Sequence, residues 1–169
     1  MINTNQPAAK NNALKTIVLA GLLVGSLDIL SAFVDYYIAT GKGPGGVLRY
    51  VASGFFGKEA FAGGTGMALW GLFFHFVIAF SFTIFFYWLY SRIKFLSSRV
   101  ILTAILYGIF VWMVMNLLVV PMSNTPKSPA PVKVYKIIKS ALILIFMIGL
   151  PLSIIMKAHF SKIRKTDHD

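Results

Sequence analysis

The chain has 169 residues, of which 57% are hydrophobic and only 12% are charged, and its mean hydropathy is +0.77. A soluble domain has about 25% charged residues, so this composition excludes an ordinary water-soluble protein and indicates an integral membrane protein. Because the chain has no cysteine, disulfides, thiolate metal sites and cysteine nucleophiles are excluded as well.

Lysine and arginine outnumber aspartate and glutamate 16 to 5, which gives a formal net charge of +11. The basic residues fall almost entirely outside the apolar runs, as is typical of the flanks of membrane helices. Nucleic-acid binding is the alternative explanation of the charge, but the chain has no RNA-binding or helix-turn-helix signature. We therefore expect the lipid bilayer and its anionic head groups, and no nucleic acid, as partners.

Four apolar segments are long enough to cross a bilayer core about 30 Å thick as helices. They are residues 16–39, 68–90, 100–120 and 137–156. The first segment could be read as a secretory signal, but it is too long, Asp28 interrupts it and no cleavage site follows. The sequence thus predicts an all-α integral membrane bundle of four transmembrane helices, with a polar tail at residues 1–15 and a basic tail at residues 157–169.

The connection between the first two spans is rich in glycine at both of its ends. Between the glycines, apolar residues recur at near-helical spacing, while Arg49 and Lys58 fall on other faces. This pattern predicts a short amphipathic helix at about residues 47–61 that lies in the membrane interface. A re-entrant segment that dips back among the helices is the alternative.

The distribution of basic residues predicts the orientation. With both termini in the cytoplasm, nine of the 16 basic residues lie inside, and the tight second loop holds Arg92, Lys94 and Arg99. The third loop contains Pro126, Pro129 and Pro131 and is predicted to be extended.

One face of the first span carries small and acidic residues spaced four, three, four and three positions apart: Gly21, Gly25, Asp28, Ala32 and Asp35. Glycines let another helix approach closely, whereas an ionised carboxylate at mid-span costs about 2.5 to 3.5 kcal/mol. We therefore expect this stripe to pack against protein and its aspartates to have partners.

Counting 1.5 Å per residue from the outer end of each span gives the depth of the polar side chains. Asp28 lies about 16 Å deep, His75 about 10 Å, and Asp35 and Asn116 about 6 Å each. The sequence therefore predicts an intramembrane polar cluster of Asp28, Asp35, His75 and Asn116, in which Asp28 meets His75 and Asn116 is the next candidate partner.

A structural role is the alternative for each member of this cluster. A lone histidine or asparagine in an apolar helix can simply tie two helices together. Asp35 is close enough to the interface to be hydrated. Asp28 is the strongest functional candidate. A charged side chain near mid-membrane costs free energy, so its presence there indicates a function.

No enzyme signature accompanies these residues: the chain has no HExxH, Gly-x-Ser-x-Gly or Walker motif. A metal site needs three or four ligands, and His159 and His168 lie near the end of the chain. We therefore expect no cofactor and no metal, and the sequence favours a non-enzymatic role.

Four segments, in order, resemble a group of small uncharacterised four-span bacterial membrane proteins, similar to the YagU-like inner-membrane family. They are LAGLLVGSLDILSAF, VLRYVASGFFGKEAFAGG, LWGLFFHFVIAF and YGIFVWMVMNLLVVPMS. The resemblance covers residues 19–123 and rests on Gly21, Gly25, Asp28, Arg49, Ser53, Gly54, Gly57, Phe61, Gly63, Gly64, His75, Asn116 and Pro121. It implies a multi-pass protein of the bacterial inner membrane, but no activity, because none is established for the group.

Two functions follow from these observations. The polar cluster could bind or move a small polar solute or a proton. Because four short spans offer little room for a transport path, we expect a transporter of this size to form a homo-oligomer. Alternatively, the chain is a non-catalytic accessory or scaffold subunit that binds a membrane partner protein.

Overall fold

The structure is a computed structural model that describes residues 6–127 and 133–166. Within these ranges all regular secondary structure is helical and no strand occurs. Four helical segments are long and apolar enough to cross a membrane: Asn12–Thr40, Gly64–Arg92, Val100–Met122 and Val134–Arg164. The predicted all-α bundle of four spans, with a short helix between the first and second, is confirmed.

The first half of the chain forms two long helices joined by a shorter helical segment. Helix α1 (Gln6–Thr40) is followed by α2 (Gly45–Phe56), the 3-10 turn η1 (Gly57–Phe61) and α3 (Gly64–Arg92). Gly57 ends α2 with a φ of 64°, a left-handed conformation that favours glycine. Helix α2 and η1 together cover the region predicted as an interfacial helix.

The second half forms the other two spans. After the short α4 (Lys94–Ser98), the third span consists of α5 (Val100–Met113), η2 (Val114–Val119) and α6 (Val120–Met122). The fourth consists of α7 (Val134–Leu144), η3 (Ile145–Gly149) and α8 (Leu150–Thr166). Pro129 and Pro131 of the predicted extended loop lie outside the described residues, as do residues 1–5 and 167–169 of the two tails.

The segments η2 and η3 are π-helical, and each ends two residues before a proline, Pro121 or Pro151. Proline has no N–H to donate, and its ring clashes with the carbonyl four residues earlier in a regular α-helix. A wider turn before the proline relieves that clash, so the spans continue through both prolines.

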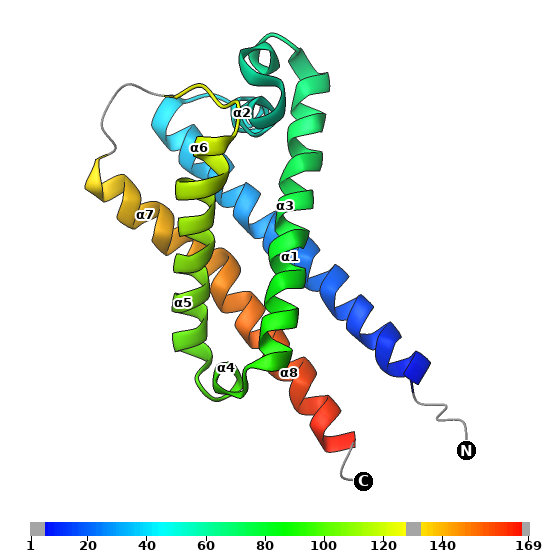
Figure 1. The fold of residues 1–169 in the computed structure, drawn as a ribbon. Coiled ribbons are helices and arrows are strands. Elements are labelled where there is room, and N and C mark those ends of the chain that lie inside the picture. The colour runs from blue at the N-terminus through cyan, green and yellow to red at the C-terminus, as the bar shows by residue number, and fades with distance from the viewer. Residues whose placement is uncertain (1–5, 128–132, 167–169) are drawn as a thin grey trace.

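In Figure 1, α3 and α5 stand side by side, and α1 and the α7–α8 span cross behind them at an angle. Both termini lie at the end of the bundle that holds α4, and α2 lies across the opposite end. We call these the α4 end and the α2 end. Helix α2 packs closely on α3, because a Cβ atom on Gly71 would lie only 1.9 Å from the carbonyl oxygen of Leu48.

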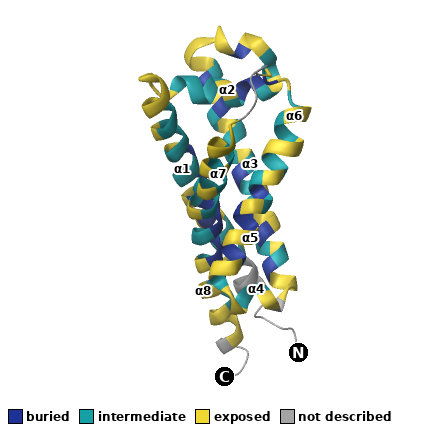
Figure 2. Ribbon diagram, turned by 90° about the vertical axis from the view of Figure 1, so that its left-hand side faces the viewer, coloured by how far each residue is buried: buried dark blue, intermediate teal, exposed yellow. Residues whose placement is uncertain are grey.

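The hydrophobic core lies where α1, α3, α5, η3 and α8 meet: Ala20, Val24, Phe86, Tyr90, Tyr107, Val111, Ile148, Leu152 and Met156. Buried residues follow the inward faces of the helices, and exposed residues cover the outside (Figure 2). Gly108 and Gly149 let the third and fourth spans cross closely, since a Cβ on Gly149 would lie 2.2 Å from the carbonyl oxygen of Ala104.

The helices extend furthest beyond the predicted spans at the beginning of the first span and at the end of the fourth. Helix α1 begins at Gln6 instead of residue 16, and α8 continues to Thr166 instead of ending at residue 156. His159, which the sequence places beyond the last span, is therefore part of a helix within the bundle.

Candidate functional site

Asp35 and Lys139 form an ion pair between α1 and α7. The two side chains are 44% and 50% exposed, so the protein itself does not enclose either of them. The pair thus joins two helices, and either partner remains able to interact with a third group.

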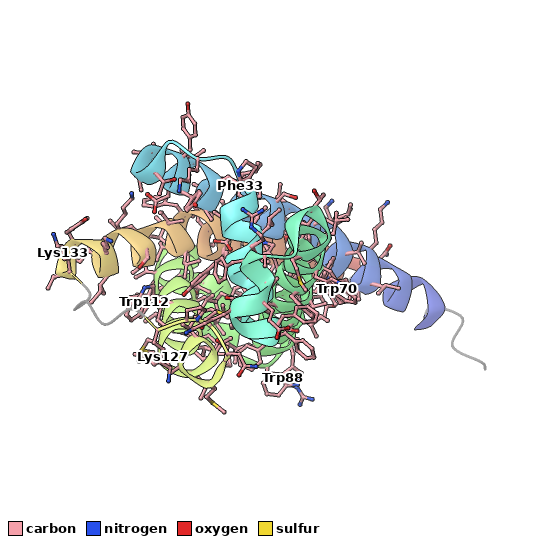
Figure 3. The ribbon with its side chains drawn as sticks, turned by 90° about the horizontal axis from the view of Figure 1, so that it is seen from above. Phe33, Trp70, Trp88, Trp112, Lys127 and Lys133 are labelled. Atoms are coloured by element: carbon pink, nitrogen blue, oxygen red, sulfur yellow. The ribbon has the colours of Figure 1, made fainter. Side chains whose placement is uncertain are left out.

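A cavity of about 360 Å³ surrounds this ion pair. It lies between α1, the third span and α7, and is lined by Asp35, Ala39, Trp112, Asn116, Tyr135, Lys136, Ile137, Lys139 and Ser140. Seen from the α2 end, Trp112 projects from the third span on the side of α7 (Figure 3). The cavity therefore collects side chains from three of the four spans.

Hydrogen bonds hold the polar wall of this cavity in place. The indole Nε1–H of Trp112 donates to Ser140 Oγ over 2.7 Å, and this hydroxyl donates to the carbonyl oxygen of Ile137 over 3.0 Å. Asn116 Nδ2 donates to the carbonyl oxygen of Trp112 over 2.9 Å. The indole of Trp112 and the hydroxyl of Ser140 are thus already used as donors, and the charged donors that line the cavity are the ammonium groups of Lys136 and Lys139.

A second cavity, of about 520 Å³, lies on the other side of Asp35, between α1 and α2. It shares Asp35 and Ala39 with the first cavity and is otherwise lined by Ala32, Tyr36, Lys42, Gly46, Val47, Arg49, Tyr50 and Phe61. Tyr36 lies against the start of α2, because a Cβ on Gly46 would be 2.4 Å from its hydroxyl oxygen.

The two cavities carry an excess of positive charge. Four cationic side chains line them, namely Lys42, Arg49, Lys136 and Lys139, and Asp35 is the one acidic residue in either lining. Apolar walls with charges of one sign raise the local concentration of counter-ions. The electrostatics of this region therefore favour an anion.

Asp28 and His75 lie apart from these cavities, since neither residue lines them. The His75 Nε2 atom is 2.8 Å from the carbonyl oxygen of Gly25. A carbonyl can only accept, so Nε2 carries the proton and Nδ1 is left for another interaction. Asp28 is close enough to the His75 ring for an electrostatic interaction, but in the described part of the chain no hydrogen bond joins the two side chains.

The predicted polar cluster is therefore divided into two groups. Asp35 and Asn116 line the first cavity, whereas Asp28 and His75 lie deeper between α1 and α3. The prediction that all four side chains meet in one band considered depth alone and left out the direction in which each side chain points. Asp35 finds its partner on α7, a helix that contributed no residue to the predicted cluster.

The other predicted residues occupy defined positions. Gly21 and Gly25 face α3, where a Cβ would lie 2.5 Å from the ring of Phe80 and 2.8 Å from that of Phe76, respectively. Arg49 lines the second cavity. Lys58 is exposed in η1 and lines neither of the two cavities.

Sequence reasoning missed Lys139, Trp112 and Ser140. A signal for Lys139 was present, because this lysine falls inside the fourth predicted span, two positions from its start. A lysine at that depth needs a carboxylate partner, and Asp35 lies four positions from the corresponding end of the first span.

His159 was missed for a different reason, since the fourth span was predicted to end before it. Its Nδ1 lies 2.9 Å from the Thr16 hydroxyl, and its Nε2 lies 3.3 Å from the Tyr87 hydroxyl. These contacts join α1, α3 and α8 near the α4 end. They stabilise the packing of helices far from the two cavities.

A comparison of the chain with protein-family models, curated proteins and solved structures found no match. The resemblance to small four-span bacterial membrane proteins therefore stays a prediction. Among residues 6–127 and 133–166, no three histidine or acidic side chains gather in a way that could hold a metal ion.

Proposed function

We propose that this multi-pass membrane protein binds a small anionic solute in the two cavities around Asp35. The observation that carries the proposal is the lining of these cavities, in which four cationic side chains surround one carboxylate. A carboxylate or phosphate group would accept hydrogen bonds from the Lys139 ammonium, and such charge-assisted bonds are the stronger kind.

In this proposal Asp35 has the role of a competitor. It neutralises Lys139 when the site is empty, so that the ammonium is not left unpaired beside apolar walls. An arriving anion replaces Asp35 as the partner of Lys139. Because both side chains are about half exposed, this exchange requires no opening of the core.

We further propose that the α2 end faces the outside of a bacterial inner membrane and that both termini face the cytoplasm. The three basic residues of the loop that contains α4 support this orientation, since such loops resist translocation. The solute would then enter from the outside. If it moves onward, the pair of Asp28 and His75 is the next polar group between α1 and α3.

Calorimetric titration of the purified protein in detergent tests this function. The ligands are inorganic phosphate, a monocarboxylate and a dicarboxylate, compared with a neutral sugar and a quaternary ammonium ion. We expect saturable binding of at least one of the anions and none of the other two ligands. Lys139→Met should weaken binding about tenfold or more, because a charged hydrogen bond contributes about 1.5 to 3 kcal/mol.

Lys58→Met is the matched control, since Lys58 is exposed near the same end but lines neither cavity. It should leave the affinity unchanged. Equal losses in the two variants would mean that only the general positive charge attracts the anion. Failure of every anion to bind, together with a stable copurifying protein, would contradict the proposal and favour the accessory role.

A further inference from the structure

Helices α3 and α5 meet mainly through aromatic side chains at their facing surfaces. The rings of Phe85 and Phe110 stack with 5.4 Å between centroids, and those of Phe86 and Tyr107 are 4.3 Å apart. Two cavities of about 400 and 320 Å³ lie along this contact and share Phe85 and Phe110. We refer to them together as the α3–α5 groove.

The groove is suited to a hydrocarbon chain, because its polar groups are already paired. The Tyr107 hydroxyl donates to the carbonyl oxygen of Phe82 over 2.6 Å, and Thr103 Oγ1 donates to that of Leu96 over 3.0 Å. Ser81 Oγ donates to the carbonyl oxygen of Val77 over 2.8 Å. These three hydroxyls therefore have no hydrogen left to donate to a polar guest.

Two arginines lie where the groove reaches the α4 end. Arg92 is the last residue of α3, and Arg99 directly precedes α5. Both are exposed, and neither has a carboxylate partner among the described residues. The guanidinium of Arg99 lies 5.9 Å from the ring centroid of Phe95, which itself lines the groove. The positive charge therefore adjoins the apolar wall.

We propose that the α3–α5 groove binds one anionic phospholipid, with an acyl chain along Phe85 and Leu89 and the phosphate at Arg92 and Arg99. The stretch of α3 from Phe85 to Ile93 rises about 12 Å, within the roughly 15 Å hydrocarbon depth of one leaflet. The planar guanidinium group matches the geometry of phosphate oxygens.

A second copy of the chain fits the groove less well than a lipid. In a two-fold dimer across this face the same surface would meet itself, so that Arg92 and Arg99 would approach the same arginines of the other copy. Like charges repel, whereas the negative charge of a lipid phosphate attracts both arginines. The charge at the end of the groove thus selects the lipid as its occupant.

Native mass spectrometry of the protein released from vesicles of equal phosphatidylglycerol and phosphatidylcholine content tests this site. We expect one lipid to be retained, with phosphatidylglycerol strongly preferred. The preference should fall roughly fivefold for each arginine removed in Arg92→Gln and Arg99→Gln, since each basic residue contributes about 1 kcal/mol of attraction to anionic lipid. Arg164→Gln removes an exposed cation at the same end, but on α8, which contributes no residue to the groove lining, so it should have no effect.

A second pair of variants tests the apolar part. Leu106→Trp should fill the groove and reduce the retention of lipid, whereas Ile101→Trp adds the same ring to α5 outside the groove lining and should not. Equal retention of both lipids, equal effects of Arg92→Gln and Arg164→Gln, or a dimer lost on Leu106→Trp with no bound lipid would each overturn the proposal.

Discussion

His75 on α3 donates its Nε2–H to the carbonyl oxygen of Gly25 on α1, with 2.8 Å between the two atoms. The same glycine lets α3 approach, because a Cβ at this position would lie 2.8 Å from the Phe76 ring. Gly25 thus supplies both the acceptor and the space for the contact. This arrangement brings the imidazole within electrostatic reach of Asp28.

The effects of Asp28→Asn and His75→Phe should depend on each other. The histidine variant removes the contact with Gly25 and replaces the polar imidazole near Asp28 with an apolar ring, at a cost of about 1 kcal/mol for the hydrogen bond. In a double-mutant cycle of unfolding free energies in detergent, we expect a coupling of at least about 0.5 kcal/mol. Strict additivity would show that the carboxylate and the ring do not interact.

Gly71→Ala should destabilise the packing of α2 on α3. The added methyl group would lie 1.9 Å from the carbonyl oxygen of Leu48, so the backbones must separate, at about 1 to 3 kcal/mol. Gly66→Ala is the control in the same helix, because no atom lies within 4 Å of the added carbon. Thermal unfolding monitored by circular dichroism should distinguish the two, and equal melting temperatures would count against this packing.

Tyr107→Phe should weaken the contact between the third span and α3. The buried hydroxyl donates to the Phe82 carbonyl oxygen over 2.6 Å, so its loss should cost about 1 kcal/mol. Tyr37→Phe removes the same group from an exposed position and should leave the stability unchanged. Denaturant unfolding in detergent checks both variants. An unchanged stability of Tyr107→Phe would mean that the hydroxyl contributes nothing to the contact.

The fold was more predictable from sequence than the site. A bilayer requires long apolar helices, and this requirement made the four spans recognisable. The short helix before α3 was recognisable from the near-helical spacing of its apolar residues. Which residues face one another depends on helix crossing angles, which hydropathy does not encode. The partner of Asp35 was therefore missed, although Lys139 lay inside a predicted span.

Close approach between helices was only partly predictable. The spacing of Gly21 and Gly25 in a stripe with two aspartates predicted close packing of α1, but no such pattern in the sequence indicates the close contacts at Gly71 and Gly149. A proline within a helix usually predicts a kink or an end of the helix. The π-helical turns before Pro121 and Pro151 instead allow both helices to continue past the proline. The position of His159 in the bundle follows from the continuation of α8.

Cysteine labelling should establish the orientation, and the absence of native cysteine makes the experiment clean. In intact cells, Lys58→Cys should react with an impermeant thiol reagent, since η1 lies at the α2 end. Ser98→Cys, next to α5 at the α4 end, should react only after permeabilisation. The reverse pattern would invert the proposed orientation but leave the arrangement of the cavities unchanged.

The affinity of Asp35→Asn for the anion bound by the unmodified protein tests the central claim most directly. If Asp35 competes with the solute for Lys139, its neutralisation should tighten anion binding, by up to about fivefold because an exposed ion pair contributes up to about 1 kcal/mol. Lys139→Met should weaken binding of the same anion, although both variants lose the same ion pair. Opposite shifts in the two dissociation constants are the predicted result, and weaker binding in both variants would contradict the account.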